Sequence, residues 1–264
     1  MKRILVPVDF SSTSLNALQY GIEMFREEPL QVTLANFYAT PKGGAFMMKN
    51  LDSIMEREAS DSMNGLLKEM EGKYPNVSFV TKVLNEDAAS TISDMGDSGK
   101  YDYIVMGTKG ASGLKEVFMG SVAGEVISST TAPVIVVPAS YAYRPAEEVL
   151  MTIGDEPVAD NVVEPLIELL RITGDHLKIV HIVKKSDEKM EVPLGKLEPY
   201  VTQQDYIFGS GDVNEDLNDY ILKDGARLVC MVRTRKGFFN RIFNESVTLK
   251  QTFHSPVPLL ILHA

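Results

Sequence analysis

Short, continuously apolar runs alternate with longer stretches of helical periodicity along the first 138 residues. Runs such as Ile4-Leu5-Val6 lack a polar alternation, which is typical of parallel strands that helices cover on both faces. Strands are predicted over residues 3–8, 30–38, 77–84, 102–106 and 134–138, and helices over 13–26, 45–73, 88–97 and 121–129. This order predicts an α/β fold with a doubly wound parallel sheet.

The same order of elements starts again at residue 149. Strands are predicted over residues 149–153, 177–183, 201–208, 228–232 and 257–262, and helices over 162–172, 213–222 and 246–253. One constant offset of 125 residues places Met106 on Met231 and Pro133 on Pro258. A fixed offset indicates an internal repeat. We therefore predict two tandem domains of five parallel strands each, related by a pseudo-two-fold axis, over residues 1–140 and 147–264.

The two copies differ at the second helix. In the second copy, residues 184–199 contain two prolines and a glycine, which disfavour a helix there. In the first copy, methionines recur at helical spacing along residues 45–73, and they are Met47, Met48, Met55, Met63 and Met70. We interpret this stripe as core packing, with a groove for a ligand or partner as the alternative.

Composition excludes several classes of protein. Of the 264 residues, 44% are hydrophobic and 23% are charged, which are globular proportions. The net charge of −10 disfavours binding to nucleic acid or to acidic membranes, but a few aimed amides can still hold one small anion. Cys230 is the single cysteine, and its apolar neighbours predict a buried, inert thiol. No apolar run reaches a membrane-spanning length, so we expect a cytoplasmic protein.

The strongest local signal follows the predicted strand at residues 102–106. Two residues separate Gly107 from Gly110, and after nine more residues Gly120 and Ser121 open a predicted helix. Because glycine allows positive φ and close backbone approach, such a loop can cradle phosphates with its amides. The free amides of a helix start add a partial charge of roughly +0.5. The alternative is an ordinary connection with turn glycines and a serine N-cap.

This spacing of three glycines and a serine resembles the ATP-binding motif of the universal stress protein family. The segments KRILVPVDFS at residues 2–11 and APVIVVP at residues 132–138 are similar to the first and last strands of that family. The chain is thereby identified as a tandem-type member. The resemblance implies an adenine nucleotide α-hydrolase-like fold that binds ATP or another adenine nucleotide at the carboxyl ends of the strands, with Mg²⁺ held by the phosphates.

The resemblance also implies roles for individual residues. Pro7, Val8 and Asp9 would contact adenine and ribose, and the Asp9 carboxylate would accept hydrogen bonds from sugar hydroxyls. The alternative for Asp9 is a structural role as the N-cap of the next helix, although Ser11 or Ser12 could serve as well. The remaining predicted contacts are Met106 beside the nucleoside and, around ribose and phosphates, Gly107, Gly110, Gly120, Ser121 and Val122.

A further contact with the base is implied on the second strand. It falls on Asn36 or Phe37, and we predict Phe37.

The second copy lacks this motif. Val232, Arg235 and Glu245 stand where the first copy has its glycines. A β-branched valine resists positive φ, and a carboxylate about 4 Å from a phosphate costs roughly 4 kcal/mol at an effective dielectric of 20. We predict that the second copy does not bind ATP. The basic run from Arg233 to Arg241 could bind another anion, or pair with nearby acids.

No motif for catalysis or for a metal site is evident. We therefore predict an ATP-binding stress or regulatory protein, with slow ATP hydrolysis as the most catalysis expected. A hydrolase or nucleotidyl transferase and a nucleotide-free scaffold are the alternatives. The expected partners are an adenine nucleotide and an unidentified protein client, without nucleic acid or membrane. The chain would be a monomer with an internal pseudo-dimer, or a homodimer through the last strands at Ile135 and Leu260.

Overall fold

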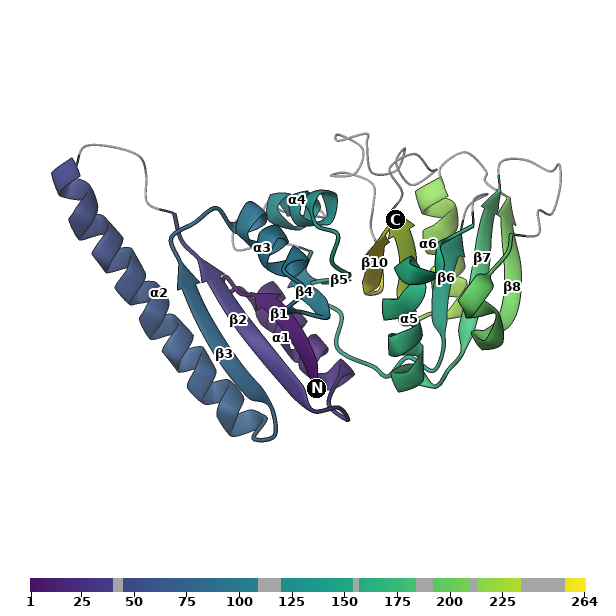
Figure 1. Cartoon of the computed structure of the whole chain (residues 1–264), viewed down its shortest axis with the longest axis horizontal. Coiled ribbons are helices and arrows are strands. Elements are labelled where there is room, and N and C mark those ends of the chain that lie inside the picture. The colour runs from purple at the N-terminus through teal and green to yellow at the C-terminus, as the bar shows by residue number, and fades with distance from the viewer. Residues whose placement is uncertain (40–44, 109–119, 154–156, 184–191, 209–212, 234–254) are drawn as a thin grey trace.

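The computed structural model describes residues 1–39, 45–108, 120–153, 157–183, 192–208, 213–233 and 255–264 (Figure 1). These residues form one sheet of ten strands in the order β3-β2-β1-β4-β5-β10-β9-β6-β7-β8. Each half therefore orders its own strands as third, second, first, fourth and fifth. The α/β fold and the repeat of its topology agree with the prediction from the sequence.

The first half holds five strands and four helices. Its strands are β1 (Lys2–Pro7), β2 (Leu30–Phe37), β3 (Ser78–Leu84), β4 (Tyr103–Gly107) and β5 (Val134–Val137). Its helices are α1 (Ser12–Met24), α2 (Ala45–Lys73), α3 (Ala88–Asp97) and α4 (Ser121–Ser129). Predicted bounds differ from these by at most two residues at any end.

The second half repeats the strands but not all the helices. Its strands are β6 (Val149–Ile153), β7 (Leu177–Val183), β8 (Val201–Phe208), β9 (Val229–Arg233) and β10 (Leu259–His263). Its helices are α5 (Asp160–Thr173), the 3-10 helix η1 (Gly195–Tyr200) and α6 (Val213–Asp224). The predicted helix over residues 246–253 lies outside the described residues.

The two halves meet edge to edge. β5 and β10 pair antiparallel, with Ile135 opposite Leu260, while every other strand pair in the sheet is parallel. We expected two separate five-stranded sheets, with these strands as a possible contact between chains. Instead, they pair within the chain, because each last strand would otherwise leave a row of backbone groups unpaired.

Helices cover both faces of the first half. On one face Ile4 and Val6 pack with residues of α1 and α2, and on the other Leu5 packs with α3 and α4. Successive strand residues point to opposite faces, so a continuously apolar strand serves both cores. Met63 and Met70 of α2 are buried, which confirms core packing for these two members of the methionine stripe.

Two polar or reactive side chains of the second half, Cys230 and His181, are buried, and the predicted burial of the Cys230 thiol is confirmed. Cys230 is fully buried, and burial raises the pKa of its thiol. His181 is buried, its ring stacks on Tyr206, and its Nε2 lies 3.3 Å from Oε1 of Gln204. Within the described part of the chain, no helix is both long and apolar enough to cross a bilayer.

Candidate functional site

A cavity lies at the carboxyl edge of the first half. The structure brings nine of the ten predicted site residues to its walls, and they are Pro7, Val8, Asp9, Phe37, Met106, Gly107, Gly120, Ser121 and Val122. Gly110, the tenth, lies outside the described residues. The nine come from three parallel strands and the start of a helix, which is the edge where ligands of such sheets bind.

The turn after β1 fixes the Asp9 carboxylate. Its Oδ1 accepts hydrogen bonds from the backbone N–H of Ser11, at 3.1 Å, and from the Ser11 hydroxyl, at 2.6 Å. Phe10, between them, has φ of 60°, a left-handed conformation that a non-glycine residue seldom adopts. Ser11 is the N-cap of α1 and accepts from the backbone N–H of Ser14. The alternative role of Asp9 as the N-cap is therefore wrong.

Asn36 and Phe37 have different roles. Asn36 is buried, and its Nδ2 donates to the carbonyl oxygen of Val8 at 2.8 Å. The backbone N–H of Val8 donates to Ala35, also at 2.8 Å, so β2 holds the end of β1 from two sides. Phe37 instead lines the cavity. Asn36 positions the strand end, and Phe37 supplies the surface.

Other wall residues carry no motif that the sequence could reveal. They are Ser14, Ala88, Ile92 and Ala123, which lie on α1, α3 and α4. Packing of these helices over the strand ends brings the residues to the cavity. Helical apolar periodicity marks Ile92 and Ala123 as buried, but it does not show what they border. With Val8 and Met106, they make the wall mainly apolar.

The start of α4 forms the opposite end of the cavity. Its N-cap is Gly120, with φ of −65° and ψ of 151°, and among the described residues no side chain caps the helix. The backbone N–H of Gly120 donates to the carbonyl oxygen of Thr108. A serine N-cap, the alternative considered above, is therefore wrong. The first-turn amides carry the partial positive charge of the helix end toward the cavity residues Ser121 and Val122.

Gly107 is needed for a different reason than we expected. Among the described glycines, positive φ occurs at Gly99, Gly174, Gly195 and Gly225, but not at Gly107. A Cβ at Gly107 would lie 2.5 Å from Cγ2 of Thr13 and 3.1 Å from the Thr13 carbonyl oxygen. This position therefore needs glycine because α1 packs against the end of β4.

The pairing registers align the second half with the first. Leu5 lies opposite Ile104, and Leu150 lies opposite Val229. Since Ile104 and Val229 are 125 residues apart, Leu150 occupies the position of Leu5, and Thr152 occupies that of Pro7.

The same alignment places Val232 where the first half has Gly107. Val232 and Thr152 are both buried, and the Thr152 hydroxyl has no hydrogen-bond partner among the described residues. At these two positions the second half has buried, branched side chains where the first half has residues that line the cavity. Arg235 and Glu245, the other two replacements predicted for the motif, lie outside the described residues.

Comparisons with known proteins agree with this architecture. The model of the universal stress protein family matches residues 1–138. Universal stress protein MJ0531 of Methanocaldococcus jannaschii is 30% identical over 142 residues, which are 52% of this chain and 81% of that protein. Universal stress protein MJ0577 of the same organism is 28% identical over 158 residues, which cover 52% of this chain and 94% of that protein.

A solved structure matches the whole chain. It is a universal stress protein from Archaeoglobus fulgidus, with a TM-score of 0.67 and 18% identity, and the match covers 99% of this chain and 96% of that one. At this identity the likeness shows the fold alone, but it extends over both halves. The family model covers more than half of the residues and includes every predicted site residue. The chain belongs to the universal stress protein family.

Proposed function

We propose that the first half binds ATP or another adenine nucleotide and that the protein has a regulatory role in a stress response. One observation supports this most directly. Nine residues implied by the family resemblance, drawn from separate strands and a helix, line a single cavity. The carboxyl edge of a doubly wound sheet is the usual ligand position of such folds.

The walls of the cavity suit the three parts of a nucleotide. Phe37, Ile92 and Met106 offer apolar surface to a purine ring. The carboxylate of Asp9, oriented by Ser11, suits ribose hydroxyls. The start of α4, without a side-chain cap, suits phosphates. A chain of net charge −10 would then attract a polyphosphate through backbone amides rather than through its average field.

Mg²⁺ would come with the phosphates. Asp9 is the single ionisable side chain among the described residues of the wall. The described residues also contain no group of three or more His, Cys, Asp or Glu side chains that could hold a metal ion. Magnesium retains several waters and binds readily to nucleotide phosphates, so it needs no protein cage here. With one titratable group among the described wall residues, we propose nucleotide binding rather than rapid catalysis. We also propose that the protein acts in the cytoplasm.

Mass spectrometry of the ligand released from denatured protein is the most direct test. We expect about one unchanged adenine nucleotide per chain when the protein is purified without added ligand or after loading with ATP. Multiple turnovers of ATP would instead favour a slow hydrolase. Failure of the wild type to bind any adenine nucleotide up to millimolar concentration would favour a scaffold and contradict the proposal.

Substitutions at Gly120 test the phosphate end. Asp and Asn are both good N-caps, so Gly120→Asp and Gly120→Asn should each preserve α4. The added carboxylate should repel phosphate by roughly 4 kcal/mol, weakening ATP about a thousandfold in calorimetric titration. The neutral Asn variant controls for competition between its side chain and phosphate for the same amides. Equal affinities of the two variants would show that no phosphate lies at this helix end.

A further inference from the structure

The carboxyl end of α4 is held by the second half of the chain. Nη1 of Arg233, at the end of β9, donates to the carbonyl oxygens of Ile127, at 3.2 Å, and Ser128, at 2.7 Å. Nε2 of His263, at the end of β10, lies 3.0 Å from the Ile127 carbonyl oxygen. These carbonyls belong to the last turn of a helix, whose carbonyls have no partner within the helix.

The first half holds the same helix end from the other side. Oδ1 of Asp97, the last residue of α3, accepts from the Thr130 hydroxyl at 2.7 Å and from the backbone N–H groups of Thr131, at 2.7 Å, and Ala132, at 3.2 Å. These residues connect α4 to β5. The segment that ends α4 is therefore fixed by groups from both halves of the protein.

The length of α4 makes this attachment matter for its other end. Nine residues span about 14 Å at 1.5 Å per residue, and a helix this short is marginal without tertiary contacts. Its N-cap residue, Gly120, has no side chain that could cap it, and Ser121 and Val122 are exposed. Contacts at its carboxyl end therefore help to set the direction in which its first amides point. A cation there also complements the helix dipole.

The protonation state of His263 fits a donor at this place. Burial lowers the pKa of His263, and Arg233 nearby lowers it further, while the hydrogen bond to Ile127 and the charge of Asp97 oppose them. The ring is therefore neutral near pH 7, with its proton on Nε2. Nδ1 is buried and has no hydrogen-bond partner among the described residues.

We infer that Arg233 and His263 are positioning residues of the nucleotide site, which act through α4. This inference rests on the proposed function, because it takes the start of α4 as the phosphate end. Arg233 follows Val232, the residue that replaces the first glycine of the motif in the second half. The second half, which lacks the glycine motif, therefore supports α4, the helix whose start is the phosphate end of the site in the first half.

The test separates phosphate binding from adenosine binding. Arg233→Gln and His263→Phe should each raise the Kd of ATP about tenfold, equivalent to about 1.4 kcal/mol, and leave that of adenosine within about twofold. Arg233→Lys and His263→Gln keep a donor and should recover most of the affinity. Arg171→Gln is the matched control, since Arg171 is an exposed arginine in the last turn of α5.

Hydrogen exchange of the α4 amides gives a readout without nucleotide. Exchange over residues 121–129 should be faster in Arg233→Gln and His263→Phe than in the wild type or Arg171→Gln. Equal weakening of ATP and adenosine, or unchanged ATP affinity with unchanged exchange, would overturn the inference while the proposed function stands. A wild type that binds no nucleotide would overturn both, even if the exchange rates differ.

Discussion

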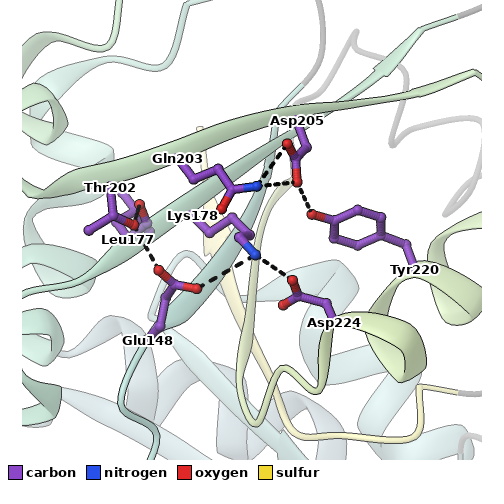
Figure 2. Close-up of polar contacts among 8 residues, drawn as sticks. All are labelled: Glu148, Leu177, Lys178, Thr202, Gln203, Asp205, Tyr220 and Asp224. Carbon is purple, nitrogen blue, oxygen red and sulfur yellow. Dashed lines mark hydrogen bonds and ion pairs between the residues drawn. The ribbon is translucent and has the colours of Figure 1, made fainter.

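The two halves differ in the side chains that they place at aligned positions on one face of the sheet. In the first half these side chains border an open trough, and in the second half they form a polar network. The lining of the open trough includes Arg3, Thr33, Val80 and Lys82 from the strands, Asp94 from α3 and Ser98, the C-cap of α3. The strand registers align these four strand residues with Glu148, Lys178, Gln203 and Asp205. In the second half, these side chains join α6 in a network of polar contacts (Figure 2).

The network is centred on Lys178. Its Nζ forms an ion pair with Asp224, and Oε2 of Glu148 lies 3.9 Å away. The hydroxyl of Tyr220 donates to Asp205, which also accepts from Gln203. The contacts with Asp224 and Asp205 tie α6 to the sheet, and the hydrogen bond to Asp224 raises the pKa of Lys178. By contrast, Lys82 in the first half has no hydrogen-bond or ion-pair partner in the described part of the chain.

The carboxyl edges differ in the same sense. The first half lines a cavity there, whereas the second half has the buried side chains of Thr152 and Val232 at the positions of Pro7 and Gly107. The two halves therefore share one topology but have different side chains at corresponding positions. This is why fold alone does not establish function.

The largest effect on stability is expected from removing the ammonium group of Lys178 at the centre of the polar network. Lys178→Met should lower the free energy of unfolding by about 3 kcal/mol, because Asp224 and Glu148, whose side chains are 16% and 35% exposed, lose the cation that they contact. Lys82→Met in the open trough is the matched control and should stay within about 0.5 kcal/mol. Denaturant unfolding monitored by circular dichroism measures both. Similar values for the two variants would contradict the contrast between the polar network and the open trough.

A smaller effect is expected at the contact that requires Gly107. Gly107→Ala should destabilise the protein by about 1–3 kcal/mol, since the new methyl meets Thr13. Thr13→Ser removes the Cγ2 methyl and should recover part of this loss in the double variant. Gly65→Ala is the control, because a Cβ at Gly65 meets nothing within 4 Å and α2 should gain stability.

If Gly107 served only to let a ligand approach, the effects of Gly107→Ala and Thr13→Ser on the free energy of unfolding would be independent. Additive changes in the free energy of unfolding would therefore contradict the packing explanation.

The smallest effect concerns the junction of the halves and depends on pH. The pKa of His263 lies below its usual 6.5, so the unfolded chain binds a proton at higher pH than the folded protein. The contribution of His263 to stability is therefore lost as pH falls below about 6.5, by at most about 1.4 kcal/mol for the first pH unit. The Tm of His263→Gln should decrease less than that of the wild type when the pH is lowered from 7.5 to 5.5. A larger acid loss in His263→Gln would contradict this assignment.

Much of the fold could be predicted from local patterns. The bounds of α2, α3, α4, β6, β7 and β8 agree with those expected, because apolar runs and helical periodicity depend on neighbouring residues. The site residues are those that the resemblance to the universal stress protein family implies, and the structure gathers nine of them at one cavity. Ser14, Ala88, Ile92 and Ala123 were missed, since nothing local distinguishes a helix residue beside a cavity from one beside another side chain.

The sequence by itself determined the repeated α/β topology, the buried strands and the half that retains the glycine motif. The tertiary structure alone decided that β5 and β10 join the halves in one sheet, that Gly107 makes room for Thr13, and that Arg233 reaches α4. Each of these rests on atoms from segments far apart in the chain, as Arg233 and Ile127 are. Such contacts depend on how formed elements pack, and the order of residues within any one element does not specify them.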